Sequence, residues 1–216
     1  MTRIKICGLT NLEDARAAIA CGADMLGFNF YRPSPRFIEP QDAQAIIKTL
    51  RAEIKDLPRS VTMVGVFVNE ASAESVARIA EPARLDAIQL HGDESAGFCE
   101  ELKAVLPNRF LIKVISTPAD ATEQAREYDV DAIMLDAFDR ELRGGTGRTV
   151  DWDLARRIAQ VVPRLFLAGG LSPENVAAAI SEVQPYAVDA CTALESSAGH
   201  KDAGRMKAFV HAVRNG

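Results

Sequence analysis

Two residues that can transfer protons each follow a short apolar run in the sequence. Cys7 follows the segment 3–6, and Asp136 follows Ile133, Met134 and Leu135. A single thiol at a strand end is more often a buried hydrophobic residue than a reagent. An ionised carboxylate after an apolar run needs an ion partner, solvent or a functional role. Together, a thiolate and a carboxylic acid can remove a proton from carbon and donate one to oxygen.

The elements that must position this pair are short apolar segments that alternate with amphipathic ones along the whole chain. They predict eight strands, each followed by a helix or a connection. An open doubly wound sheet usually has about five or six strands, so the count favours an α/β fold of the closed (β/α)8 barrel type. No linker divides residues 1–216, and we expect one domain. The predicted strands lie within 3–10, 24–30, 61–68, 85–92, 110–115, 131–135, 164–168 and 186–190.

Capping residues indicate where several helices begin and end. Asn11 is expected to cap the first helix and Gly22 to end it. Asp93 is expected to cap a helix that runs to Val105, and Pro173 to occupy the first position of the helix after the seventh strand. The remaining predicted helices are 40–55, 72–80, 120–127, 151–159 and 203–213.

In such a barrel the first and sixth strands face each other across the mouth, where the carboxyl ends of the strands open. Cys7 and Asp136 would then stand on opposite walls, and a substrate in the mouth would contact both. This arrangement suits an isomerase, which moves protons and needs no metal. A base that works near neutral pH should have a lowered pKa, and we expect Lys5 or a nearby dipole to lower that of Cys7.

Three loops are candidates for binding an anionic substrate. The turn after the seventh strand contains Gly169 and Gly170, and the loop after the eighth contains Thr192 and Ala193. Loops in these positions often bind phosphate, although glycine pairs also occur in ordinary tight turns. The connection 137–150 contains Gly145 and is long for a compact domain, which is typical of a functional loop.

Arg36 and His91 are further candidates for substrate contacts. Most loop arginines are simply solvated, but Arg36 follows a segment stiffened by Pro33 and Pro35, and a guanidinium held there can bind a carboxylate through two hydrogen bonds. A single histidine more often satisfies a local hydrogen bond than acts on a substrate, so His91 is taken as a binding contact at most.

The composition limits the other possible functions. The formal charge of −5 argues against a nucleic-acid partner, and no apolar run is long enough to span a membrane. The sequence begins without the pattern of a secretory signal, so we expect a cytoplasmic protein that binds a small molecule, as a monomer or homodimer. The four cysteines lack the spacing of a metal site, and we expect reduced thiols.

The order and spacing of several short motifs resemble the phosphoribosylanthranilate isomerase family of tryptophan biosynthesis over essentially the whole chain. The most specific is Lys5-Ile6-Cys7-Gly8-Leu9-Thr10. The other matching segments are 27–30, 32–36, 65–69, 89–92, 135–136, 144–147, 167–171 and 188–189.

The resemblance implies an Amadori rearrangement of N-(5-phosphoribosyl)anthranilate to 1-(2-carboxyphenylamino)-1-deoxyribulose 5-phosphate. It implies that Asp136 is the general acid, Cys7 the general base and Arg36 the ligand of the anthranilate carboxylate. In the family the loop after the eighth strand usually reads Ser-Ser-Gly-Val-Glu, whereas here it reads Cys-Thr-Ala-Leu-Glu at 191–195. If the family's glycine has a positive φ or lets phosphate approach, Ala193 would be strained or would crowd the phosphate.

Two other readings remain open. Another phosphosugar barrel, such as an aminoimidazole carboxamide ribotide isomerase or a ribulose-phosphate epimerase, would show a half-barrel repeat with aspartates or a set of metal ligands, and neither pattern is visible. A barrel that only binds an anionic ligand is favoured by the changed loop at 191–195, and opposed by the presence of both Cys7 and Asp136.

Overall fold

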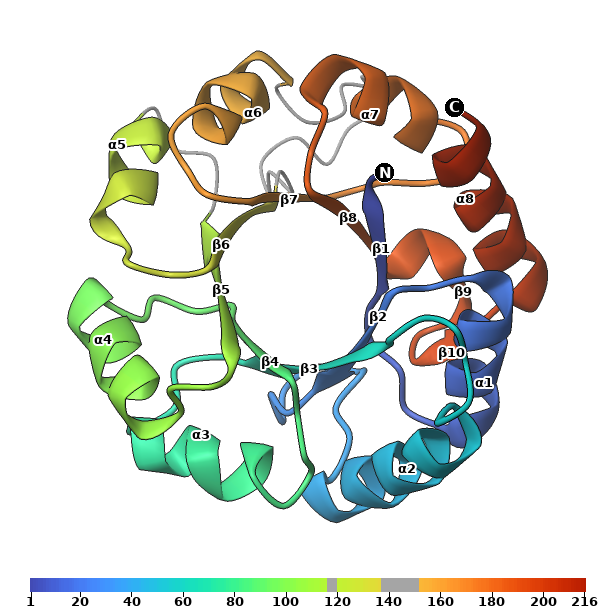
Figure 1. The fold of residues 1–216 in the computed structure, drawn as a ribbon, viewed down its shortest axis with the longest axis horizontal. Helices are drawn as coiled ribbons and strands as arrows, with labels where there is room; N and C mark the ends of the chain where they lie inside the picture. The colour runs from blue at the N-terminus through green and yellow to red at the C-terminus, as the bar shows by residue number, and fades with distance from the viewer. Residues whose placement is uncertain (116–119, 137–151) are drawn as a thin grey trace.

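The computed structural model describes residues 1–115, 120–136 and 152–216, and within them eight parallel strands close into a barrel in sequence order (Figure 1). Strand β1 pairs with β2 on one side and with β8 on the other, which confirms the predicted barrel. The strands are β1 Arg3–Ile6, β2 Met25–Asn29, β3 Thr62–Phe67, β4 Ala87–Leu90, β5 Phe110–Ile115, β6 Ala132–Asp136, β7 Leu165–Ala168 and β8 Ala187–Ala190.

Side chains alternate between the two faces of each strand, and this alternation divides the buried apolar residues into two clusters. Side chains of one parity fill the barrel interior, and those of the other parity pack against the surrounding helices, as pleated strands require. Val64 of β3 and Phe166 of β7, for example, are fully buried inside the barrel. The apolar interior residues are Met25, Val64, Ala87, Ile112, Val114, Ala132, Met134, Phe166, Ala168 and Ala187.

The helices form a ring outside the strands (Figure 1), and the last helix packs against the first. Asn11 accepts a hydrogen bond from Asp14 N, and Gly22 ends α1 with a φ of 107°, both as predicted. The helices are α1 Leu12–Cys21, α2 Pro40–Glu53, α3 Ala73–Ala80, α4 Ala96–Val105, α5 Ala121–Glu127, α6 Trp152–Ala159, α7 Val176–Val183 and α8 Ala203–Asn215.

Two predicted helix starts are wrong. Ser95, not Asp93, caps α4, because its hydroxyl accepts the hydrogen bond from Phe98 N. Pro173 does not begin α7: it lies in a turn in which Val176 N bonds to Ser172 O, and the helix starts at Val176. A turn at 173–175 precedes α7, and an irregular segment, 91–94, precedes the cap of α4; composition alone reveals neither.

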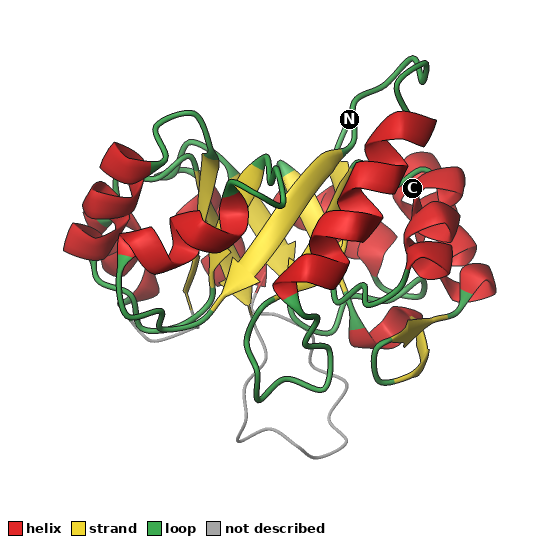
Figure 2. Cartoon of the chain, turned by 90° about the horizontal axis from the view of Figure 1, so that it is seen from below, coloured by secondary structure: helices red, strands yellow, loops and turns green. Residues whose placement is uncertain are grey.

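A small unit after β8 was not predicted. It consists of a 3-10 turn η1, Thr192–Leu194, and a two-stranded hairpin of β9, Glu195–Ser197, and β10, His200–Lys201. Figure 2 shows this hairpin at the end of the barrel toward which the strand arrows point. It therefore contributes side chains to the mouth of the barrel.

Candidate active site

Cys7 lies at the carboxyl end of β1 and shares a strand face with Lys5. Its N–H continues the barrel ladder by donating to Ala190 O at 3.0 Å, and the residue is 9% exposed. The next residue, Gly8, has a φ of 74°, and a Cβ there would lie 2.6 Å from Arg36 Cδ and 2.9 Å from Cys191 Sγ. The chain can therefore turn out of the barrel beneath Arg36 only because residue 8 is glycine.

A buried ion pair lies directly beneath this thiol. Lys5 Nζ and Asp189 Oδ1 are 3.0 Å apart, and their side chains are 0% and 9% exposed. Burial raises the pKa of the Cys7 thiol, and Lys5 offsets only part of that effect. The expectation that Lys5 would lower the pKa of Cys7 below its usual value is therefore wrong: the lysine has the expected influence, but burial is the larger effect.

Asp136 is the last residue of β6 and shares the interior face of Ala132 and Met134. It stands on the opposite wall from Cys7, as predicted from the order of the strands. His91, which follows β4, places Nε2 at 3.3 Å from Asp136 Oδ2. The predicted candidates Asp136 and His91 are thus in direct contact at the mouth.

His91 is oriented from below by Gln89. Gln89 is 1% exposed, and its Nε2 lies 3.1 Å from His91 Nδ1. This contact orients the imidazole so that Nε2 faces Asp136. Gln89 was not predicted as a site residue, although its position two residues before His91 places it on the same strand face.

The loop that carries His91 is fixed by a second buried ion pair. Glu94 and Lys113 are 3.0 Å apart with side chains only 2% exposed. Lys113 Nζ also donates to Gly92 O at 2.6 Å, and Glu94 accepts from Gly92 N and from Asn69 N. Both peptide groups of the residue after His91 are thereby held.

Arg36 reaches the mouth from the loop after β2 and is bound by Glu195 of β9. Two hydrogen bonds, Nε to Oε1 at 2.8 Å and Nη2 to Oε2 at 2.7 Å, join them, and Nη2 also lies 3.3 Å from Thr192 Oγ1. Lys201 donates to Glu195 Oε1 at 2.8 Å. Burial opposes the charge on Glu195, but the hydrogen bonds from Arg36 and Lys201 prevail and lower its pKa to about 2.

The two candidate phosphate loops follow the neighbouring strands β7 and β8. Gly169 and Gly170 have φ values of 83° and 71°, and the space beside Gly170 is open. Ala193 lies within η1 and has no positive φ, so the strain considered from the sequence is absent. The candidate Gly145 and its loop lie outside the described residues.

The candidates Cys7, Asp136, His91 and Arg36 lie at the mouth, whereas the residues that hold Arg36 in place were not predicted as site residues. Glu195 and Lys201 lie on the unpredicted hairpin, whose two strands are only three and two residues long. Segments this short carry too little periodicity to be recognised. The available signal was the match of Glu195 to the glutamate that ends the family's loop, in the segment 191–195.

The fold and its mouth define a (β/α)8 barrel of the type that carries enzyme active sites at the carboxyl ends of its strands. Among residues 1–115, 120–136 and 152–216, no group of three or more His, Cys, Asp or Glu residues could hold a metal ion. None of the helices in these ranges is long and apolar enough to cross a membrane.

Comparison with known proteins identifies the family. Residues 4–212 match the family model described as N-(5'phosphoribosyl)anthranilate (PRA) isomerase. The curated isomerase of Geobacter sulfurreducens is 42% identical over 214 residues, which cover 99% of each chain. That of Syntrophus aciditrophicus is 44% identical and covers 99% of this chain and 88% of its own.

Solved structures agree with this result. Phosphoribosyl anthranilate isomerase from Thermotoga maritima is 39% identical, covers 99% of both chains and superposes with a TM-score of 0.85. The chain belongs to the phosphoribosylanthranilate isomerase family. The resemblance, the barrel fold and the enzyme class predicted from the sequence are confirmed, and the isomerases of this family act in tryptophan biosynthesis.

Proposed function

We propose that a single domain, residues 1–216, catalyses the Amadori rearrangement of N-(5'-phosphoribosyl)anthranilate with Asp136 as general acid and Cys7 as general base. Family membership supports the reaction. The observation that carries the mechanism is the placement of a thiol at the end of β1 and a carboxyl group at the end of β6, on opposite walls of one mouth.

The reaction needs two proton transfers. Asp136 protonates the furanose ring oxygen as the bond from that oxygen to C1 breaks, which leaves a Schiff base between C1 and the anthranilate nitrogen. The Cys7 thiolate then removes the proton from C2, and the enolamine that forms tautomerises to the product ketone. Each step moves protons between the substrate and one side chain, so no cofactor is required.

The remaining candidates bind the two ends of the substrate. Arg36 binds the anthranilate carboxylate through the edge of its guanidinium that Glu195 does not occupy. The backbone near Gly169, Gly170, Thr192 and Ala193 binds the phosphate. A solved isomerase in complex with reduced 1-(o-carboxyphenylamino)-1-deoxyribulose 5-phosphate, 37% identical and with a TM-score of 0.82, supports a ligand of this size in the barrel.

His91 holds Asp136 and contacts the substrate beside it, and Gly145 contributes from the long loop. We place the enzyme in the cytoplasm, with a small phosphosugar as its ligand and no nucleic acid or membrane as its partner. A monomer and a homodimer are both compatible with this proposal, and a related Thermotoga maritima enzyme is described as dimeric.

The test is turnover of freshly prepared phosphoribosylanthranilate in EDTA, followed by the loss of anthranilate fluorescence. Cys7→Ala and Asp136→Asn should each abolish turnover, while binding of the reduced product analogue stays nearly unchanged. Activity retained in either variant would disprove its acid or base role.

An inactive but folded wild-type protein that still binds the analogue would instead favour a barrel that only binds its ligand. Turnover of an aminoimidazole carboxamide ribotide with no turnover of phosphoribosylanthranilate would favour a ribotide isomerase. Both outcomes would overturn the proposed reaction.

A further inference from the structure

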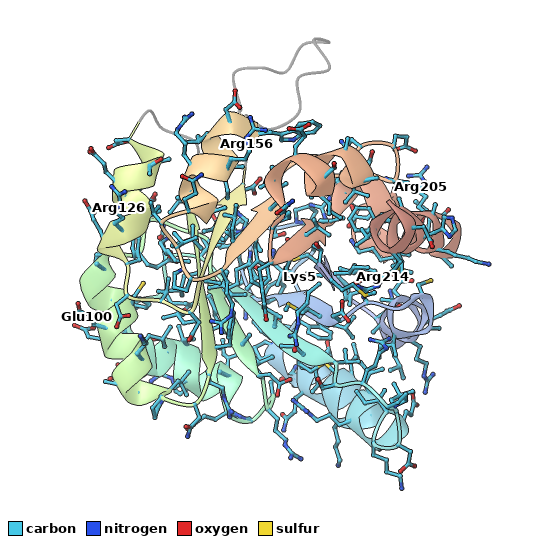
Figure 3. The ribbon with its side chains drawn as sticks, turned by 45° about the horizontal axis from the view of Figure 1, so that its top comes forward. Lys5, Glu100, Arg126, Arg156, Arg205 and Arg214 are labelled. Carbon is cyan, nitrogen blue, oxygen red and sulfur yellow. The ribbon has the colours of Figure 1, made fainter. Side chains whose placement is uncertain are left out.

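Lys5 is a charged residue in the interior of the barrel. Figure 3 shows it among the strands, whereas Glu100, Arg126, Arg156 and Arg205 lie on the outer helices. Its side chain is 0% exposed, and its ion pair with Asp189 joins two residues that are direct neighbours across β1 and β8. The mechanism proposed above assigns no role to this pair.

The pair is poorly explained as a source of stability. Replacement of a buried ion pair by apolar side chains of similar volume is often neutral or stabilising, because both charges lose their hydration. Most other interior positions, such as Met25 opposite Lys5 on β2, carry apolar side chains, and Gln89 of β4 is polar but uncharged. A buried ammonium on this face therefore calls for a functional explanation.

The position of Lys5 relative to Cys7 provides one. Residues 5 and 7 lie on one face of β1, two residues apart. A Cβ on Gly27 would lie 2.8 Å from Cys7 Sγ and 3.1 Å from Lys5 Nζ, so both atoms border the same small space. Glycine at position 27 leaves this space open between the thiol and the ammonium.

We propose that Lys5, held in place by Asp189, is a positioning residue that stabilises the thiolate of Cys7 inside the barrel. The proposal rests on the assigned role of Cys7 as the base. Burial raises the pKa of Cys7 and so lowers the fraction of thiolate near neutral pH. The ammonium increases the fraction of thiolate available to remove a proton from carbon.

Other charged groups also face this thiol and must be considered. Asp189 on β8 opposes the thiolate, and Lys201 on β10 favours it more weakly than Lys5 does. Arg36 and Cys191 interact with it across Gly8. Among these cations Lys5 has the largest effect on the thiol, and it lies on the same strand face.

The experiment measures the alkylation of Cys7 by iodoacetamide as a function of pH in the intact chain. The modified tryptic peptide is 6–16 in the wild type and 4–16 in Lys5→Met, which lacks one cleavage site. Cys21, on the outer helix α1, provides a reference in the same sample. The variants are Lys5→Met, Asp189→Asn and their combination.

The two single variants should shift the titration in opposite directions. Lys5→Met should slow alkylation of Cys7 about tenfold or more at neutral pH, equivalent to a shift of about one pKa unit toward alkaline pH. Asp189→Asn retains an oxygen that can accept from Lys5 but loses the negative charge, so its titration should move toward acid. The alkylation of Cys21 should be unchanged in every variant.

Turnover gives a second readout. Lys5→Met should lower kcat at neutral pH with little change in KM, and part of the loss should be recovered as the pH is raised. If Lys5→Met does not fold, the double variant Lys5→Met/Asp189→Asn replaces it, because it leaves no unpaired buried charge. Its alkylation curve for Cys7 should still lie at a more alkaline pH than that of the wild type.

The role of Lys5 would be overturned if the alkylation curves of Cys7 shifted in the same direction in both single variants. It would also be overturned if neither curve shifted. Alkylation reports on the thiol and does not depend on turnover. This outcome is therefore distinct from failure of the proposed role of Cys7 as the base, which an active Cys7→Ala variant would reveal.

Discussion

Arg36 and Glu195 bind each other edge to edge, through the pair of hydrogen bonds from Nε and Nη2 to the two carboxylate oxygens. The side chain of Glu195 is 4% exposed and that of Arg36 is 20% exposed, so the carboxylate is buried while the guanidinium reaches the mouth. Lys201 binds the same carboxylate from behind. Glu195 therefore fixes which edge of the guanidinium faces the mouth, and Arg36 is oriented before any substrate arrives.

This pairing predicts that Glu195→Gln weakens substrate binding more than it slows the reaction. An amide has one acceptor oxygen and cannot match both donors of Arg36, so the guanidinium loses its fixed orientation. We expect KM to rise about tenfold, with kcat within about twofold of the wild type, in steady-state fluorescence assays. Glu53→Gln, which removes the partner of an exposed Arg16, is the matched control and should leave both constants unchanged. An equal fall in kcat and in kcat/KM in Glu195→Gln would contradict this account.

The lowered pKa of Glu195 also predicts how stability depends on pH. A carboxyl group whose folded pKa is about 2 and whose usual value is 4.5 stabilises the fold above pH 4.5 and loses that contribution as the pH falls toward 2. The free energy of unfolding of the wild type should therefore exceed that of Glu195→Gln at neutral pH, and the difference should shrink between these two values. Urea titrations at a series of pH values measure it. A difference that stays constant over this range would show that the ion pairs of Glu195 do not stabilise the fold.

A pair of glycine and alanine exchanges tests the two phosphate loops. Ala193 has no positive φ, so Ala193→Gly should leave KM within about twofold of the wild type and should not improve phosphate binding. Gly170 has a φ of 71°, and although no atom would clash with a Cβ there, alanine would pay about 1–2 kcal/mol of backbone strain. Gly170→Ala should relieve that strain by a local shift of the loop, with a higher KM and a nearly unchanged kcat. A lower KM in Ala193→Gly would show that the family's glycine has a role that this loop lacks.

The residues at the mouth could be predicted because they depend on strand order alone. In a barrel closed in sequence order, the ends of β1 and β6 face each other, so Cys7 and Asp136 could be placed across the mouth without knowledge of any contact. Asn11 and Gly22 were predicted correctly as helix ends because capping is local chemistry.

What the sequence could not supply is the balance between opposing effects and the pairing of distant charges. The pKa of Cys7 depends on how far burial outweighs Lys5, and that requires coordinates. Arg36 and Glu195 are 159 positions apart, and no periodicity links them. The start of α4 was misplaced for a related reason: Asp93 and Ser95 are both good caps, and only the coordinates show that the Ser95 hydroxyl accepts from Phe98 N.

Glu94, the residue before this cap, forms an ion pair with Lys113 in which both side chains are only 2% exposed. Lys113→Met leaves the Glu94 carboxylate without its cation and should lower the free energy of unfolding by about 3–5 kcal/mol in urea titrations. Adding Glu94→Gln should recover part of this loss, because the amide oxygen can still accept from Asn69 N without a buried charge. Lys103→Met, which removes a partly exposed partner of Asp129, should cost about 0–1 kcal/mol and serves as the control. If the double variant is no more stable than Lys113→Met, the peptide contacts of Lys113 with Gly92, and not the unpaired charge, account for the loss.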